Sequence, residues 1–122
     1  MDFAYIGMGY GTALGFAVGQ PERPTVLVMG DGSFLMTLGE LETVVREDIP
    51  LVIVLMNDAA YGAERHFLQL RDKPVATAQF PDVDYAPLAQ ALGFETATLR
   101  SLDALEALVP LMRAPQGPIF VE

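Results

Sequence analysis

The chain has 122 residues, which is room for one domain around one hydrophobic core. Its 16 acidic and 7 basic residues give a net charge of −9 without any basic stripe, which argues against nucleic acids and anionic membranes as partners. Cysteine is absent, which excludes disulfides, thiolate metal sites and thiol nucleophiles, and the 52% of apolar residues predicts that some surface packs against another domain or chain.

The first predicted element lies in residues 3–20, which contain no charged side chain. A stretch of this length raises the question of a membrane span, but it holds five glycines, and Asp2 stands where a signal peptide would carry positive charge. We therefore expect a cytoplasmic protein in which this segment is buried soluble structure. Gly11, Gly15 and Gly19 recur at every fourth position, which predicts a helix whose small-residue face lets a backbone or a flat ligand approach closely.

A strand–helix–strand unit follows. Residues 25–29 and 51–56 are continuous apolar runs, the pattern of parallel strands that are buried on both faces. Between them, apolar side chains with helical spacing predict one amphipathic helix that ends near residue 47: Phe34, Leu38, Leu41 and Val45. A right-handed crossover places the carboxyl ends of both strands at one edge of the sheet. Asp31 and Asp58 therefore emerge side by side, where open α/β sheets bind ligands.

The rest of the chain continues the alternation of helices and strands. We expect a helix over residues 61–70, an irregular loop over 71–81, a helix from Asp84 to Leu92 stopped by Gly93, a strand over 94–99, a helix that Ser101 caps and Pro110 kinks or ends, and a strand over 118–121. Residues 1–122 thus predict one α/β domain with three layers, α/β/α, around a mostly parallel sheet.

The turn after the first strand reads Gly30-Asp31-Gly32-Ser33 and opens a helix. Backbone N–H groups at a helix start attract phosphate, but a carboxylate there repels it unless a divalent cation lies between them. Asp58 supplies a second carboxylate from the neighbouring strand end, and such hard oxygen ligands suit Mg²⁺ or Ca²⁺. The sequence predicts a metal–phosphate site. The alternative is that both aspartates are ordinary turn residues.

Gly30-Asp31-Gly32, followed after 24 residues by Asn57-Asp58, resembles the signature of thiamine diphosphate-dependent enzymes. The whole chain is similar to their C-terminal, diphosphate-binding domain in the acetolactate synthase, benzoylformate decarboxylase and pyruvate decarboxylase group, which implies the thiamine diphosphate-binding fold. The resemblance implies that Asp31 and Asp58 bind Mg²⁺ through their side chains and Ala60 through its carbonyl. Asp58 stands where the family usually has asparagine, which adds one negative charge. The diphosphate is expected among four further residues: Gly32, Ser33, Tyr61 and Gly62.

The resemblance also extends to the glycine-rich start and to the second helix. Met8 matches the large apolar residue that bends the cofactor from beneath, next to Gly7, and the Ile6 carbonyl would accept a hydrogen bond from the cofactor's amino group. The alternative for Met8 is a filler of the core. Glu64 matches a glutamate of the pyruvate decarboxylase branch that donates a proton near the reacting carbon. Its alternative is a solvated helix residue that pairs with an arginine, and the role of His66 stays open.

The resemblance implies an enzyme that decarboxylates a small 2-oxo acid, a lyase if an aldehyde is released and a transferase if a second carbonyl is joined. The activating glutamate of this family lies on a pyrimidine-binding domain, usually of another subunit. We therefore expect the chain to be a fragment or a split subunit of a larger homo-oligomeric enzyme, incomplete without that domain. The sequence selects neither the 2-oxo acid nor decarboxylation over carboligation.

Three other classes are weighed against this one. A phospho-receiver domain has a similar length, a doubly wound sheet and an acidic Mg²⁺ site, but it needs a lysine at the end of its last strand, and the sole lysine, Lys73, lies in the predicted loop. A hydrolase built on Ser33 needs glycines where Asp31 and Leu35 stand. The third is a non-catalytic domain kept for assembly.

Overall fold

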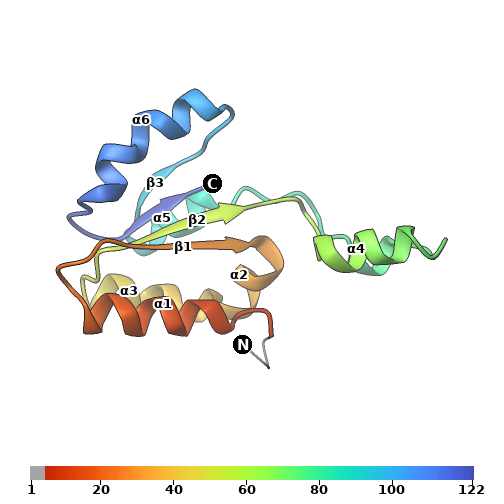
Figure 1. Cartoon of the computed structure of the whole chain (residues 1–122), viewed down its shortest axis with the longest axis horizontal. Helices are drawn as coiled ribbons and strands as arrows, with labels where there is room; N and C mark the ends of the chain where they lie inside the picture. The colour runs from red at the N-terminus through yellow and green to blue at the C-terminus, as the bar shows by residue number, and fades with distance from the viewer. Residues whose placement is uncertain (1–4) are drawn as a thin grey trace.

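The computed structural model describes residues 5–122 (Figure 1). Asp2 and the first two residues of the uncharged stretch lie outside this range. The elements in chain order are α1 (Met8–Gly19), β1 (Thr25–Gly30), α2 (Asp31–Thr37), the 3-10 turn η1 (Leu38–Glu40), α3 (Leu41–Arg46), β2 (Leu51–Met56), α4 (Gly62–Gln69), the 3-10 turn η2 (Ala76–Ala78), α5 (Ala86–Leu92), β3 (Glu95–Ala97), α6 (Leu102–Arg113) and β4 (Ile119–Val121).

The strands form one parallel sheet in the order β1-β2-β4-β3. β1 and β2 run in register over their whole length, from the pair Thr25–Leu51 to the pair Gly30–Met56. β4 pairs with β2 on one side and with β3 on the other. Because all the pairs are parallel, the carboxyl ends of the strands lie along one edge, which confirms the predicted α/β class.

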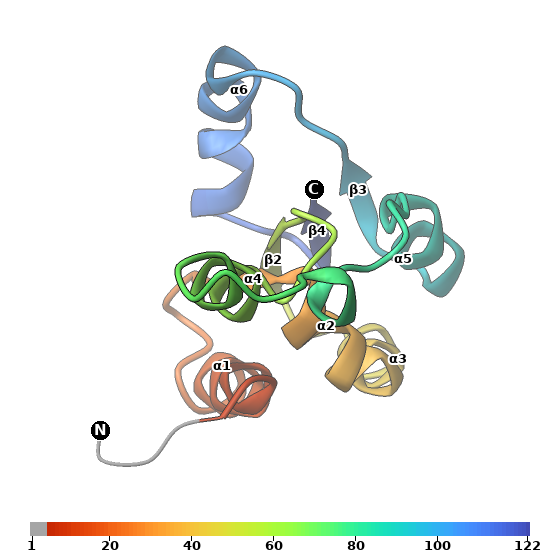
Figure 2. The same cartoon turned by 90° about the vertical axis from the view of Figure 1, so that its right-hand side faces the viewer.

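Helices cover both faces of the sheet. On one face α1, α2, α3 and α5 pack with the strands around a core whose centre includes Phe34, Ile53 and Phe120, each 0% exposed. On the other face α6 packs against the cluster Val52, Ile119 and Val121. Figure 2 shows α1 and α3 on the side of the sheet opposite to α6. The three-layer α/β/α arrangement is therefore confirmed.

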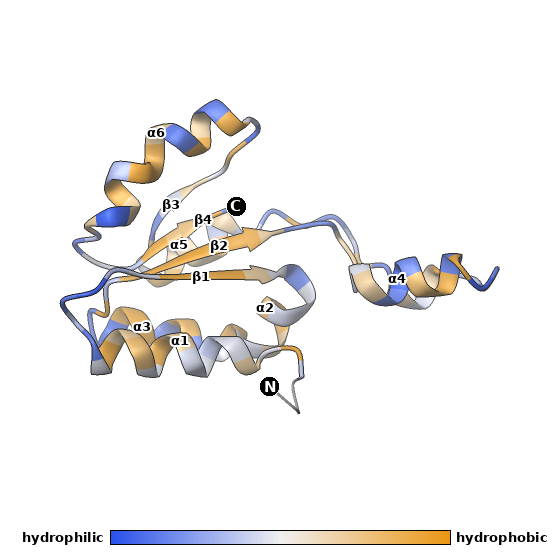
Figure 3. Ribbon diagram, in the orientation of Figure 1, coloured by the Kyte–Doolittle hydropathy of each residue, from blue (hydrophilic) through white to orange (hydrophobic). Residues whose placement is uncertain are grey.

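Two parts of this layered body stay uncovered by the described residues. β1 alternates strictly between buried and exposed, and its outward side chains Val26 and Val28 are 44% and 63% exposed. α4 projects past the carboxyl edge of the sheet (Figure 1), and none of its residues is buried. Figure 3 shows β1 and β2 as hydrophobic along their length, whereas α4 mixes both kinds of side chain. Apolar surface is thus available for other protein, as the composition predicts.

The segment between β1 and β2 is the main departure from the expected elements. One helix was expected, but η1 separates α2 from α3. The Thr37 hydroxyl donates to the carbonyls of Ser33 and Phe34, both at 3.3 Å, and Gly39 follows in the turn. Side-chain bonds to the backbone compete with the helical ladder, and glycine is a poor helix former, so the break has a local cause.

Two expectations about helix ends are confirmed, and of the kink or end expected at Pro110 the end is not observed. Ser101 caps α6, since its Oγ accepts from the Ala104 N–H at 3.2 Å. Gly93 ends α5 in the left-handed conformation, with φ +111°. Pro110 does not end α6, which continues to Arg113. Pro110 is exposed, so water can satisfy the carbonyl that loses its N–H partner there.

Gly93→Ala is expected to destabilise the protein by about 1–3 kcal/mol. A Cβ at this position would lie 2.9 Å from Val45 Cγ1, and the left-handed φ is unfavourable for alanine. Denaturant unfolding of this variant should be compared with that of Gly19→Ala, whose Cβ would meet nothing within 4 Å. Equal midpoints for the two variants would contradict the prediction.

A membrane-spanning helix is not found between residues 5 and 122: none there is both long and apolar enough.

Candidate functional site

The two predicted carboxylates lie at the same edge of the sheet. Asp31 is the first residue of α2 and directly follows β1, while Asp58 comes two residues after the end of β2. Gly30 and Met56, the last residues of these strands, are paired in the parallel register. The turns that carry Asp31 and Asp58 therefore start from adjacent positions.

Asp31 is buried, only 1% exposed, at the junction of the two turns. Its Oδ2 accepts a hydrogen bond from the Ala60 N–H at 3.1 Å. Burial raises the pKa of the Asp31 carboxyl, the backbone N–H groups around it lower that pKa in part, and the charge of Asp58 raises it again. A cation at this position would favour the charged form of Asp31, against the effects of burial and of the Asp58 charge.

Asp58 is held from the other side by α4. The Nη2 of Arg65 lies 3.0 Å from Asp58 Oδ2, and its Nη1 lies 3.4 Å from the Asp58 carbonyl oxygen. Gly62 makes room for this carboxylate, because a Cβ there would lie 2.7 Å from Oδ2. The ion pair compensates part of the charge that an aspartate adds at this position.

Gly32 and Tyr61 meet between the two turns. A Cβ on Gly32 would lie 2.6 Å from Cδ1 of Tyr61, so only glycine lets the ring pack this closely. The Tyr61 ring also packs edge-on against Phe80, with 4.6 Å between ring centroids, and its N–H donates to the Ala78 carbonyl at 2.9 Å. The segment that follows α4 therefore returns to brace the turn after β2.

The glycine-rich start docks onto the turn after β1. The Gly7 N–H donates to Ser33 Oγ at 2.8 Å, and Gly7 has φ +90°, a conformation that favours glycine. Ile6 is exposed, and Met8 is half-buried in the first turn of α1. The structure therefore brings Ile6, Gly7 and Met8 to the same region as Ser33.

The remaining predicted residues lie apart from this junction. Glu64 and His66 are exposed on the projecting α4. Arg65 pairs with Asp58, and Arg71 lies over the Phe67 ring at 4.0 Å, so the described contacts do not pair either arginine with Glu64. A Cβ added to Gly11, Gly15 or Gly19 would meet nothing within 4 Å among the described residues, so no segment of this range packs closely against these glycines.

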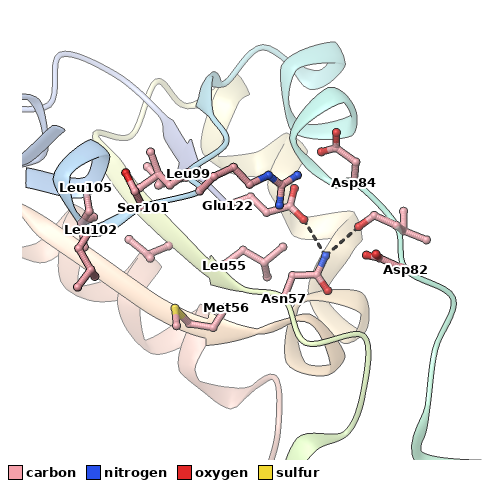
Figure 4. A pocket seen from close by; sticks show the side chains of 14 residues that line it. Leu55, Met56, Asn57, Asp82, Asp84, Leu99, Ser101, Leu102, Leu105 and Glu122 are labelled. Atoms are coloured by element: carbon pink, nitrogen blue, oxygen red, sulfur yellow. Dashed lines mark hydrogen bonds between the residues drawn. The ribbon is translucent and has the colours of Figure 1, made fainter. Parts of the chain in front are cut away.

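Two residues hold the site without a role predicted from the sequence: Asn57, named there only as part of the signature, and Glu122. Asn57 donates through Nδ2 to Glu122 Oε1 at 2.7 Å and to the Val83 carbonyl at 2.8 Å (Figure 4). Its Oδ1 accepts from the Ala59 N–H at 3.2 Å, a local Asx turn that asparagine after a strand could have suggested. Glu122 is 65 positions away along the chain and carries no local signal.

The polar groups at this edge include donor types that a hard cation accepts. Residues 5–122 contain no group of three acidic, histidine or cysteine side chains that could hold a metal. Two carboxylates and a backbone carbonyl are nevertheless the oxygen donors that Mg²⁺ accepts, with phosphate oxygens or water completing its octahedral shell. Asp31, Asp58 and the Ala60 carbonyl supply these donor types in the two adjacent turns.

Comparisons with known proteins show the family of this domain. The family model of the thiamine pyrophosphate enzyme C-terminal TPP binding domain matches residues 2–122. A probable pyruvate decarboxylase of Schizosaccharomyces pombe is 31% identical over 100% of the chain, and the large subunit of acetolactate synthase isozyme 2 of Escherichia coli is 34% identical over 95% of it. In both cases the chain spans 22% of the relative's length.

A solved structure gives the same result for the fold. The thiamine diphosphate-dependent 4-hydroxybenzoylformate decarboxylase of Rhodococcus jostii superposes with a TM-score of 0.87 at 25% identity, over 96% of this chain and 22% of that one. Sequence family, fold and the motif around Asp31 and Asp58 therefore agree, and they disfavour the phospho-receiver and hydrolase alternatives. The chain belongs to the thiamine pyrophosphate enzymes, as a C-terminal domain that binds the cofactor.

Proposed function

We propose that this chain binds Mg²⁺ at the carboxyl edge of its sheet and, through that ion, the diphosphate of thiamine diphosphate. Asp31, Asp58 and the Ala60 carbonyl are the proposed protein ligands of the metal. The observation that carries the proposal is the buried carboxylate of Asp31, fixed by the Ala60 N–H and facing the charge of Asp58. The residues proposed to surround the diphosphate are Gly32, Ser33, Tyr61 and Gly62.

We infer that the whole protein acts on small 2-oxo acids. The named relatives include decarboxylases and acetolactate synthases, and the bound cofactor supplies an electron sink for the loss of CO₂. Because the chain spans 22% of these relatives, a pyrimidine-binding domain on another segment or chain is part of the proposal, as is a homo-oligomer. The cytoplasmic location stays a prediction.

Three residues are proposed to act on the cofactor and the substrate. Met8 would support the cofactor from beneath, and the Ile6 carbonyl would accept its amino group. The exposure of Ile6 leaves its surroundings open to a ligand. Glu64 would hold a proton near the reacting carbon, where coverage of the projecting α4 by another domain would shield it from water.

Replacing Asp58 separates the proposed metal site from an ordinary turn. Asp58→Asn keeps an oxygen for the metal, so it should bind thiamine diphosphate within about fivefold of the wild type. Asp58→Ala removes that oxygen and should weaken Mg²⁺-dependent binding by about 10- to 100-fold. Calorimetric titration of the full-length protein, with and without Mg²⁺, measures both effects.

Glu106→Gln, an exposed change on α6, is the control for altered net charge and should bind like the wild type. Equal Mg²⁺-dependent affinity in the wild type and in Asp58→Ala would refute Asp58 as a ligand. Thiamine diphosphate binding that does not respond to Mg²⁺ at all would refute the metal site.

A further inference from the structure

We propose that Glu122 is a positioning residue for the metal–diphosphate site, and that it acts through Asn57 and Tyr85 on the two turns that carry Asp31 and Asp58. This inference rests on the proposed function. Glu122 directly follows β4, and it is not among the residues expected to touch the cofactor. Its carboxylate instead connects β4 to elements on either side of the site.

The Glu122 carboxylate accepts three hydrogen bonds. Oε2 accepts from the N–H groups of Tyr85 and Ala86, both at 2.9 Å, at the start of α5. Oε1 accepts from Asn57 Nδ2 at 2.7 Å. Glu122 and Asn57 both line a pocket of about 720 Å³. Figure 4 shows the two side chains pointing toward each other, with this hydrogen bond drawn between them. We call these contacts the Glu122 bracket.

The first arm of the bracket leads to the turn after β2. Asn57, held by Glu122, also accepts from the Ala59 N–H, and Ala59 has a left-handed φ of +53°. Such a conformation is unfavourable for alanine and persists only where neighbouring contacts impose it. The next residue, Ala60, donates its N–H to Asp31 and is the proposed carbonyl ligand. A loosened Asn57 would therefore change the position of that carbonyl and of Asp58.

The second arm leads to the turn after β1. Tyr85, whose N–H is held by Glu122, packs edge-on against Phe34, with 5.3 Å between ring centroids. Phe34 is fully buried in α2, the helix that begins with Asp31. A shift of Tyr85 would therefore be transmitted to α2. One carboxylate thus fixes both turns relative to each other.

The chemistry of the bracket requires a carboxylate at position 122. A carboxylate only accepts hydrogen bonds, and both of its oxygens are used here. A glutamine has one accepting oxygen, so it can accept either from the N–H groups at the start of α5 or from Asn57. Its NH₂ group would then lie against the donor that is left without an acceptor. Asn57 could turn its oxygen toward the glutamine only by giving up the bonds to Val83 and Ala59.

The test uses the full-length protein and measures Mg²⁺-dependent binding of thiamine diphosphate by calorimetry, together with the thermal midpoint. Glu122→Gln should weaken binding by about tenfold, the effect expected of a residue that orients metal ligands. Leu111→Ala is the control, because it removes packing of α6 against the second face of the sheet without removing a hydrogen bond of the bracket. Leu111→Ala should lower the thermal midpoint about as much as Glu122→Gln does, and it should leave the affinity for thiamine diphosphate unchanged.

A second pair of variants tests the hydrogen-bond logic. Asn57→Asp alone places two carboxylates against each other and should weaken binding at least as much as Glu122→Gln. In the double variant, Asn57→Asp with Glu122→Gln, the glutamine amide can donate to the new aspartate. That aspartate still accepts from the Ala59 N–H but can no longer donate to the Val83 carbonyl. Compared with Asn57→Asp alone, the double variant lacks the repulsion between two carboxylates and should therefore bind more tightly.

The outcomes separate the two proposals. A wild type that shows no Mg²⁺-dependent binding overturns the proposed function, and the inference with it. A wild type that binds normally, beside a Glu122→Gln variant of equal affinity, overturns only the positioning role. Equal loss of affinity in Leu111→Ala and Glu122→Gln, or a double variant that binds no more tightly than Asn57→Asp, also overturns it.

Discussion

Asp31→Asn is expected to abolish Mg²⁺-dependent binding of thiamine diphosphate and, at the same time, to stabilise the protein when no metal is present. The loss of binding should be roughly 100-fold or more, because an amide replaces the most buried charged ligand of the proposed site. The gain in stability follows from the same burial. Asparagine can keep the hydrogen bond from the Ala60 N–H without placing a charge next to Asp58.

The sign of the pH dependence follows from the direction of the pKa shift. Burial raises the pKa of Asp31 in the folded protein above the ordinary value of 3.8, so ionisation costs folding free energy. Below the ordinary pKa this cost is absent, and it develops as the pH rises from the ordinary to the raised value. Asp31→Asn should therefore exceed the wild type in thermal midpoint at neutral pH and lose that advantage in acid.

Thermal unfolding without metal, measured from neutral to acidic pH, and calorimetric titration with Mg²⁺ test the two halves of this prediction. Asp103→Asn, which removes an exposed carboxylate on α6, is the matched control and should leave Mg²⁺-dependent binding unchanged. A less stable Asp31→Asn protein at neutral pH would contradict the account of burial. Retained Mg²⁺-dependent affinity would contradict the role of Asp31 as a ligand.

Gly32→Ala should damage both stability and binding through the ring of Tyr61. The new Cβ would lie 2.6 Å from Cδ1 and 2.7 Å from Cε1, so the ring has to move. Overpacking of this kind costs about 1–3 kcal/mol. Tyr61 directly precedes α4, whose first residue, Gly62, lies against Asp58. A displaced Tyr61 ring should therefore also lower the affinity for thiamine diphosphate, by about tenfold.

The same substitution in α1 provides the control. A Cβ on Gly15 would meet nothing within 4 Å. In a helix interior alanine is more stable than glycine by about 1 kcal/mol. Denaturant unfolding should therefore give opposite signs for Gly15→Ala and Gly32→Ala. A Gly32→Ala protein as stable as Gly15→Ala would show that Tyr61 can move without cost.

The parts of the fold that were predicted correctly depend on short-range patterns. Two apolar runs and the helical spacing between them were enough to place Asp31 and Asp58 at one edge, because parallel strands end together. The break at η1 was missed because helical spacing continues across it, whereas the cause lies in the Thr37 hydroxyl and Gly39. Periodicity reports which face is buried, and it does not report whether the backbone stays helical.

The contacts that organise the candidate site depend on the folded chain instead. Arg65 and Asp58 are close enough in sequence to suggest a pair, but only the direction of α4 decides that Arg65 binds Asp58 and not Glu64. The hydrogen bond from Asn57 to Glu122 joins the ends of two strands, and no spacing rule predicts it. The sequence thus predicts the carboxylates, while the residues that hold them require the structure.

The uncovered side of β1 has a practical consequence for work with this domain. Within residues 5–122, β1 pairs only with β2, so one of its edges carries no neighbouring strand, and the side chains of Val26 and Val28 are exposed on one of its faces. Exposed edge strands can pair with a strand of another molecule, which leads to self-association. If the domain were expressed alone, it should form concentration-dependent aggregates, and charged replacements such as Val28→Lys should keep it monomeric in light scattering.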